Sequence, residues 1–378
     1  MSDSPHKPAE KLSRRGFLIM LTGSALAAAA GCRPQDMPPV PTLYAPGSGI
    51  QPPNPASTGE PTAAASVGTF RDPRFGEIIY DQTLLTEVKD LYITQYDYGN
   101  TPEVDPTTWS LTVDGLVESP LTLNLEAIKA LPAHEDMRVL ECISDPVGGN
   151  LIGNLMWKGV LFQEILKQVK PKPEATFVRF YAADGYSTSV KVEWITQPMT
   201  LLAYEMNGEP LTVPHGFPLR IHMPGLYGQK MPRWLTRIEF IDFDYTGYWE
   251  GRGWSNIAAI KTRSMVRLPD AGGEVKPGAI VVIQGLAFAG KRDITQVEVQ
   301  IDGGEWMPAT LKTPKDPLSW TQWYLEWTIP APGSYQIGVR ATDSEGFTQE
   351  SESTGIFGGA FPNGTDAIHR TIITGVEG

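Results

Sequence analysis

Cysteine is nearly absent from this chain, which has two among 378 residues, Cys32 and Cys142. The sequence contains no CxxC pair, no CxxCH haem-attachment motif and no cysteine cluster suited to an iron–sulfur centre. Any redox centre must therefore be held by very few protein ligands. Cys32 falls in a segment with the composition of a leader. Cys142 is then the only cysteine of the folded part, with no partner for an intrachain disulfide.

Positive charge and long apolar runs are also scarce. The formal net charge is −12 at pH 7 and no basic stripe stands out, which argues against a nucleic-acid partner. The apolar run at residues 17–31 is too short for a confident membrane span. The 38 glycines and 33 prolines, with many tryptophans and tyrosines, favour a turn-rich protein of many strands over a helical bundle.

The N-terminal segment has the features of an export signal. The sequence SRRGFL at residues 13–18 is a twin-arginine signal, a route that exports folded proteins. We therefore predict an extracytoplasmic protein, in the periplasm or on the outer face of the cytoplasmic membrane. Cys32 resembles a lipid attachment site; cleavage after an Ala-x-Ala site and an uncleaved signal anchor are the alternatives. We assign residues 1–32 to this leader and residues 33–68, rich in small residues and proline, to a disordered tether.

The remaining length suits two folded domains. We place the first at residues 69–264. Alternating and helical patterns within it predict strands at 109–117, 137–142, 176–182 and 189–194, and helices at 123–131 and 161–169. Asn124 is the expected N-cap of the first helix and Pro132 its end.

Cys142 stands at the end of one of these strands. A free cysteine is commonly a buried small hydrophobe. Here, however, the strand leads into a loop with the turn-forming pair Asp145-Pro146, followed by Gly148-Gly149, where the backbone can approach a ligand. We therefore interpret Cys142 as a thiol that meets a ligand rather than as core filler.

A basic segment follows at residues 215–237, punctuated by glycines. It contains the four cations Arg220, Lys230, Arg233 and Arg237. Guanidinium groups bind oxyanions through two parallel hydrogen bonds, and glycine exposes backbone N–H groups to an anion. Two interpretations stay open on spacing alone: a phosphate-binding set and a solvated basic hairpin.

Several motifs in a fixed order resemble those of the sulfite oxidase family of molybdopterin oxidoreductases, in its bacterial exported branch without a haem domain. The resemblance covers roughly residues 91–349. The motifs are LECISDPVGG at 140–149, LAYEMNG at 202–208, HGFPLR at 215–220, PGLYGQK at 224–230 and GYWEGRGW at 247–254.

The resemblance implies a function for particular residues. Cys142 matches the single protein ligand of molybdenum, bound through its thiolate, as a soft metal–sulfur unit prefers. Tyr186 matches the tyrosine beside the metal's oxo group, and Arg252 an arginine near the substrate pocket, so the implied catalytic residues are these two and Cys142. The implied residues for binding the molybdenum–molybdopterin cofactor are Gln95, Tyr96, Asp97, His215, Arg220, Met231, Pro232 and Arg233.

Two departures from the family pattern bear on the substrate. Relatives that oxidise sulfite carry an arginine where this chain has Thr94-Gln95-Tyr96, and another where it has Asp145-Pro146-Val147. Both changes remove positive charge, which a dianion needs in a dry pocket. The expected substrate is therefore a neutral molecule such as a sulfoxide, or a different sulfur or nitrogen oxide.

A second domain is expected at residues 265–356. Short alternating segments with Asp-Gly-Gly and Pro-Gly turns between them predict an immunoglobulin-like β-sandwich. The fold class is thus α+β, a mixed molybdopterin-binding domain followed by an all-β sandwich. In the resembled family this sandwich mediates dimerisation; from the residues alone it could equally be a carbohydrate- or protein-binding module. Residues 357–378 form a tail that the pattern does not assign.

The sequence as a whole indicates an exported molybdenum-cofactor oxidoreductase that transfers an oxygen atom and two electrons to or from a small substrate. Because the chain has no haem motif, electrons pass to or from an external carrier, a cytochrome or a quinone-linked protein. A homodimer and a membrane tether through the leader are the other expected associations. The alternative is a membrane-tethered, non-enzymatic binding protein with a degenerate cofactor domain.

Overall fold

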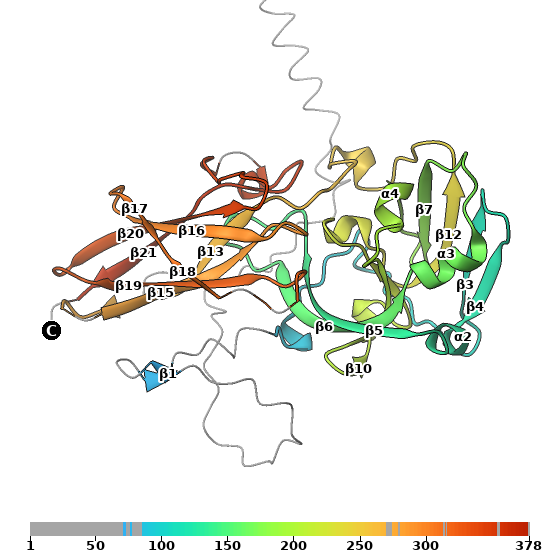
Figure 1. The fold of residues 1–378 in the computed structure, drawn as a ribbon, viewed down its shortest axis with the longest axis horizontal. Helices are drawn as coiled ribbons and strands as arrows, with labels where there is room; N and C mark the ends of the chain where they lie inside the picture. The colour runs from blue at the N-terminus through green and yellow to red at the C-terminus, as the bar shows by residue number, and fades with distance from the viewer. Residues whose placement is uncertain are drawn as a thin grey trace, which may run out of the picture. The chain divides into compact units, whose positions relative to one another are not determined.

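The computed structural model describes residues 71–72, 76–77, 85–269, 274–278, 280–312, 314, 316–353 and 356–376 (Figure 1). The leader at 1–32 and the tether at 33–68 lie outside the described residues. No helix in the described part of the chain is long and apolar enough to cross a membrane. A short antiparallel pair, β1 (Arg71–Asp72) and β2 (Gly76–Glu77), comes first in the sequence.

The first large sheet of the N-terminal domain is antiparallel. Its strands are β5 (Ala133–Glu141), β6 (Ile152–Leu161), β9 (Leu201–Met206), β10 (Glu209–Pro210) and β11 (Arg220–His222). The strand order is β10-β9-β6-β5, and β11 pairs with β9. β5 and β6 pair along their whole length, with Glu141 opposite Ile152, so the ten residues between them form a loop at one end of the sheet.

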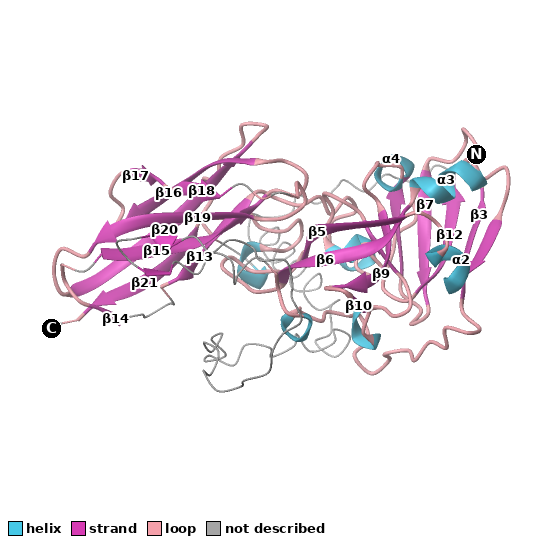
Figure 2. Cartoon of the chain, turned by 60° about the horizontal axis from the view of Figure 1, so that its bottom comes forward, coloured by secondary structure: helices cyan, strands magenta, loops and turns pink. Residues whose placement is uncertain are grey.

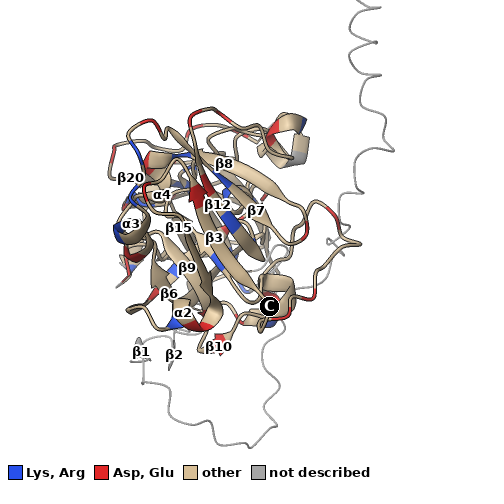
Figure 3. Ribbon diagram, turned by 90° about the vertical axis from the view of Figure 1, so that its right-hand side faces the viewer, with Lys and Arg blue, Asp and Glu red and all other residues tan. Residues whose placement is uncertain are grey.

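The second sheet is mixed. Its strands are β3 (Ser110–Gly115), β4 (Leu121–Asn124), β7 (Phe177–Ala182), β8 (Ser187–Lys191) and β12 (Leu235–Ile241). The order is β4-β3-β12-β7-β8, with β12 parallel to β3 and antiparallel to β7. Figure 3 shows acidic and basic segments near the label of β12. Arg237 of this strand forms ion pairs with Asp114 and Glu239.

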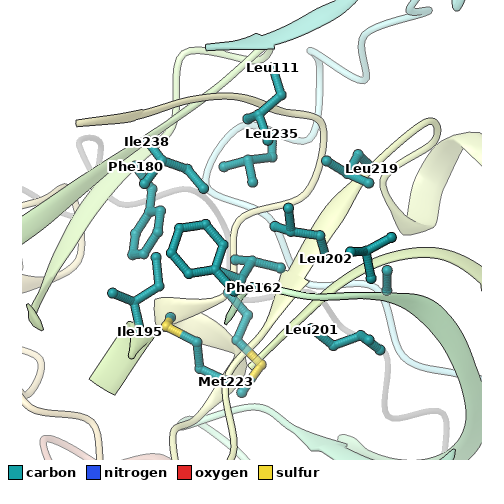
Figure 4. Packing of buried hydrophobic residues seen from close by; sticks show 14 of the residues in the cluster. Leu111, Phe162, Phe180, Ile195, Leu201, Leu202, Leu219, Met223, Leu235 and Ile238 are labelled. Atoms are coloured by element: carbon teal, nitrogen blue, oxygen red, sulfur yellow. The ribbon is translucent and has the colours of Figure 1, made fainter. Parts of the chain in front are cut away.

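Apolar side chains from both sheets form one core. Phe180 and Ile238 of the second sheet lie with Leu201 and Leu202 of the first around Phe162, and all five are fully buried (Figure 4). Alternate residues of a strand face the same side, so each sheet turns one apolar face toward this core. The shared core fixes the loops at the strand ends relative to one another.

Within the described residues, three short α-helices connect the strands: α2 (Leu125–Lys129), α3 (Gln163–Val169) and α4 (Val192–Ile195). The predicted cap is confirmed, because the side chain of Asn124 accepts a hydrogen bond from the backbone N–H of Ala127 at 2.8 Å. The predicted strand at 189–194 is wrong in its second half: β8 ends at Lys191 and α4 begins at Val192. Buried Ile195 anchors that helical turn in the core, which outweighs the alternating pattern.

Single 3-10 turns occur between these elements. They are η2 (Val88–Asp90), η3 (Val213–His215), η4 (Gly228–Lys230), η5 (Glu250–Arg252) and, in the C-terminal domain, η6 (Ile356–Gly359).

The C-terminal domain is a β-sandwich, consisting mainly of strands in Figure 2. One sheet has the order β13-β15-β19-β18 and the other β14-β21-β20-β16-β17. The strands are β13 (Arg263–Leu268), β14 (Glu274–Val275), β15 (Ile280–Phe288), β16 (Ile294–Ile301), β17 (Trp306–Pro308), β18 (Thr310–Lys312), β19 (Thr321–Thr328), β20 (Gly333–Asp343) and β21 (His369–Gly375). Between the sheets lies a core that includes fully buried Ile283, Val299, Trp323 and Val339.

The segment that the sequence pattern left unassigned, residues 357–378, contributes β21 to the sandwich. β21 pairs antiparallel with β20, from Gly333 opposite Gly375 to Val339 opposite His369. Buried Ile373 joins the sandwich core. The pairing partner of β21 is a strand some thirty residues earlier, so the local sequence carries little information about it.

Candidate active site

Cys142 opens the loop between β5 and β6, residues 142–151, here called the cysteine loop. As predicted, it follows directly on the end of a strand. Its backbone N–H donates to the carbonyl of Leu151 at 2.9 Å, and its Sγ lies 3.1 Å from Ser144 Oγ. The side chain is 8% exposed, and burial raises the pKa of the thiol. A nearby cation or metal is therefore needed to stabilise the thiolate.

A cavity lies over Cys142, with an empty volume of about 830 Å³, part of it open to solvent. The loops after β5, β7, β11 and β12 and the segment before β3 supply its wall. The lining residues are Tyr92, Thr94, Gln95, Tyr96, Leu140, Cys142, Ile143, Ser144, Asp184, Tyr186, His215, Arg220, Gly228, Gln229, Met231, Pro232, Arg233, Trp234, Trp249 and Trp254.

Aromatic rings form one side of this cavity. The ring centroids of Tyr96 and Tyr186 are 5.7 Å apart, and Tyr96 is 4.8 Å from Tyr248. The Tyr186 hydroxyl donates to the carbonyl of Gln229 at 2.7 Å, and burial raises its pKa well above the ordinary range. The Tyr96 hydroxyl donates to the carbonyl of Asp184 at 2.5 Å. Both phenols therefore stay protonated at neutral pH and are held in fixed orientations.

Two arginines of the basic segment reach the cavity. Arg220, on β11, is 3% exposed. Its guanidinium donates to the carbonyl of His215 at 3.3 Å, and its Nε finds no hydrogen-bond partner among the described residues. Burial, and to a smaller extent the nearby positive charge of Arg233, lowers the pKa of Arg220 to about 10. A buried guanidinium with an unpaired donor is costly unless an anion neutralises it. Arg220 is therefore prepared for an anionic ligand.

Arg233 is committed to the protein itself. Its guanidinium donates to the carbonyls of Pro214 at 2.5 Å and Thr94 at 3.1 Å, and to Gln95 Oε1 at 3.0 Å. These bonds tie the early loop of the domain to the turn at η3. Burial, followed by the charges of Arg220 and Arg233, lowers the pKa of His215 to about 4, so its ring is neutral near pH 7.

The basic segment does not act as one set. Lys230 is buried, forms an ion pair with Glu250 and donates a hydrogen bond to the carbonyl of Ser189 at 3.0 Å. Arg237 lies on β12 and pairs with Asp114 at 2.9 Å. Neither lines the cavity. Of the two interpretations that spacing left open, anion binding fits Arg220, whereas Arg233, Lys230 and Arg237 are bonded to the protein itself.

The structure brings together most of the residues that the resemblance implied. Two of them, Asp97 and Arg252, are not among the residues that line the cavity. Asp97 is exposed and accepts a hydrogen bond from the backbone of Gly99. Arg252 is exposed on η5, with its guanidinium 3.5 Å from the centroid of the Tyr248 ring.

Other cavity residues had no assigned function from the sequence. Trp249 and Trp254 flank Arg252 in a Trp/Arg/Gly cluster that packing alone could explain. Asp184 lines the cavity, and burial raises the pKa of its carboxyl. Gln229 is 7% exposed, and its Oε1 has no hydrogen-bond partner in the described part of the chain. Of these residues, Asp184 could have been suspected from the sequence, because it lies two residues before Tyr186.

The fold and the site define a class, which comparison with known proteins establishes. Residues 98–249 match the family described as oxidoreductase molybdopterin binding domain, and residues 255–363 match the Mo-co oxidoreductase dimerisation domain. The chain belongs to the sulfite oxidase family of molybdopterin-dependent oxidoreductases. It is therefore an enzyme of this type that uses the molybdenum cofactor, and the alternative of a non-enzymatic binding protein is set aside.

Particular relatives are similar over different lengths. An uncharacterised oxidoreductase of Bacillus subtilis, YuiH, is 38% identical over 186 residues, which cover 49% of this chain and 90% of the relative. The match to sulfite oxidase of Arabidopsis thaliana is 28% identical and covers 67% of this chain and 81% of that enzyme. NADH nitrate reductase of Hordeum vulgare is also 28% identical over 67% of this chain, but the match spans only 35% of that enzyme.

A solved structure shares the fold. The sulfane dehydrogenase SoxCD of Paracoccus pantotrophus superposes with a TM-score of 0.62 at 23% identity, over 71% of this chain and 76% of that one. At this identity the similarity supports the architecture.

The residues of the cavity fit the molybdenum cofactor. Cys142 offers a soft sulfur ligand, and Arg220 offers a buried, incompletely bonded cation for the cofactor's phosphate. The Gln229 amide oxygen offers an unpaired acceptor for a ring N–H of the pterin. Gly228 provides a close backbone approach, since a Cβ there would lie 3.0 Å from the Tyr92 hydroxyl. Cys142, His215, Arg220 and Gln229 are the residues that would hold the group.

Proposed function

We propose that this chain is exported in the folded state and catalyses two-electron oxygen-atom transfer on a small sulfur-containing or other oxo substrate. The bound cofactor would supply a metal that takes up or releases the two electrons. A separate cytochrome or quinone-linked protein exchanges electrons with it, since the sequence carries no haem motif. The match to a dimerisation domain supports a homodimer. A sedimentation coefficient of a monomer would contradict it.

The charge of the cavity lining carries the proposal about the substrate. Among the described lining residues, Arg220 and Arg233 are the only lysine or arginine side chains. Arg233 is engaged with Thr94, Gln95 and Pro214, and Arg220 is the cation available to the cofactor phosphate. No lining cation is then left for a dianion such as sulfite, while Tyr96, Trp249 and Trp254 offer apolar and hydrogen-bonding surface. These observations support a neutral substrate such as a sulfoxide.

Steady-state kinetics of the cofactor-loaded enzyme test this proposal. One assay measures kcat/KM for reduction of a small dialkyl sulfoxide with reduced viologen dye as electron donor, and the other measures kcat/KM for sulfite oxidation with ferricyanide as acceptor. We expect the value for the sulfoxide to be higher by at least about tenfold, which corresponds to the loss of one charge-assisted contact to sulfite. Efficient sulfite turnover that saturates at micromolar concentration, with the sulfoxide inert, would contradict a neutral substrate.

Export is supported by the twin-arginine motif at residues 13–18. Replacing both arginines, with Arg14→Lys and Arg15→Lys, is expected to retain the folded, cofactor-loaded chain in the cytoplasm, because this route reads the arginine pair. Fractionation of cells that express each form provides the measurement. Equal amounts of the two forms outside the cytoplasm would refute the assignment.

A further inference from the structure

A buried cluster of charges joins the sandwich to the cysteine loop. Arg263, the first residue of β13, is 3% exposed. Its guanidinium donates to Glu141 Oε1 at 2.5 Å and to Asp145 Oδ2 at 2.7 Å, and also to the carbonyl of Pro146 at 3.1 Å. The side chains of Glu141 and Asp145 are 1% and 0% exposed.

These two carboxylates bracket the metal ligand. Glu141 immediately precedes Cys142, and Asp145 follows three residues later. Asp145 also closes the loop on itself: its Oδ1 accepts from the N–H of Leu151 at 2.8 Å, and its own N–H donates to the carbonyl of Cys142 at 3.1 Å. One guanidinium thus bonds to both ends of the short segment that carries the thiol.

Without that cation the segment would hold two buried acids close together. In the described part of the chain, Arg263 is the cation that forms ion pairs with Glu141 and with Asp145. Buried like charges with no counter-ion separate, take up water or accept a proton, and each of these responses loosens the loop. The planar fork of arginine can meet both carboxylates and a carbonyl at once, which a lysine ammonium cannot do with the same geometry.

Other contacts from the sandwich meet the far half of the same loop. Arg267, also on β13, donates to the carbonyl of Gly149 at 3.1 Å. Gly148 has φ +70 and lies against the ring of His369 on β21, where a Cβ would come within 2.3 Å of the ring. Apolar contacts continue around it, since Ile143 and Ile152 share a buried cluster with Met265 and Phe288.

We propose that Arg263 is a positioning residue for the metal site. The sandwich holds the cysteine loop through this side chain and thereby fixes the direction in which the Cys142 thiol faces the cavity. The C-terminal domain is then a part of the catalytic centre as well as an assembly module. Because the cysteine loop belongs to the protein itself, its position can be probed in the full chain without the cofactor.

The test measures how fast a maleimide alkylates Cys142 in the folded, cofactor-free full chain bearing Cys32→Ser, at one fixed pH. For Arg263→Met we expect at least a tenfold faster reaction, and for Arg263→Lys a smaller but clear increase. Bound molybdenum in chains matured with the cofactor should fall in the same order. Arg340→Met is the control, because Arg340 on β20 pairs with Glu298 on the neighbouring strand β16 of the sandwich.

A second comparison separates positioning from general stability. Adding Glu141→Gln to Arg263→Met removes one of the two unpaired carboxylates, so the thiol is expected to regain much of its protection; a side chain that only filled space would not be rescued in this way. If Arg263→Met fails to fold, Arg263→Lys decides alone. Alkylation within twofold of the parent in every folded Arg263 variant, with unchanged metal content, would overturn the proposal. A parent chain that binds no molybdenum would refute the proposed function without affecting the alkylation result.

Discussion

Cys142→Ser is expected to abolish stable binding of molybdenum and, with it, catalytic turnover. The serine hydroxyl is almost isosteric with the thiol but remains protonated at neutral pH, so it cannot replace a thiolate ligand. Because loss of even an outer-shell partner of a metal costs about 10- to 100-fold, loss of the ligand itself should reduce activity by more than about 100-fold. Elemental analysis and pterin fluorescence of protein matured in a molybdenum-replete host give the metal and pterin content.

The thermal unfolding of the cofactor-free chain should change little, since serine is close in size to Cys142 and can keep the contact with Ser144 Oγ. Cys32→Ser is the matched control, because it removes the only other thiol of the chain. Stoichiometric molybdenum in Cys142→Ser would show that another group ligates the metal.

Arg220→Met is expected to have two effects of opposite sign. The buried charge, whose pKa is lowered to about 10, destabilises the cofactor-free fold. Each pKa unit corresponds to about 1.4 kcal/mol, and the variant loses the contacts with the His215 carbonyl and the Trp157 ring. We therefore expect the cofactor-free variant to gain about 1–2 kcal/mol in the free energy of unfolding. Its affinity for the cofactor should fall about 10- to 100-fold, the worth of a buried charge-assisted hydrogen bond.

Lys230→Met provides the contrast. Lys230 is also buried, but it is paired with Glu250, whose side chain is 2% exposed. Its removal leaves that carboxylate without a counter-ion and should destabilise the fold by about 3–5 kcal/mol. Urea unfolding of the two cofactor-free variants checks both signs. A destabilised Arg220→Met that retains the cofactor normally would mean that Arg220 is a structural ion rather than a ligand for the cofactor.

Local patterns predicted much of the N-terminal domain. The strand that ends before Cys142 and the helix capped by Asn124 rest on short-range rules of hydrophobic spacing and capping, and both are confirmed. The pattern failed at residues 192–195 and gave no information about β21. In both places a distant partner decides the conformation: the core around Ile195, and the edge of β20.

The candidate site shows the same division. Motif order placed Cys142, Tyr186 and Arg220 in one family site, and all three line one cavity. The motif could not separate Arg220 from Lys230, because the difference between them is the carboxylate of Glu250, twenty residues away. It also could not show that Arg252 stacks on Tyr248 outside the lining.

The sequence by itself determined the class of this protein, the candidate thiol ligand Cys142 and the absence of arginine at residues 94–96 and 145–147. These properties reside in residue identity and in the order of short motifs. Only the tertiary structure decided that the buried cation Arg220 is available to a ligand, whereas Lys230 is paired with the buried carboxylate of Glu250. It also decided that Arg263 of the sandwich holds the loop of Cys142, since a buried charge depends on partners brought together from distant parts of the chain.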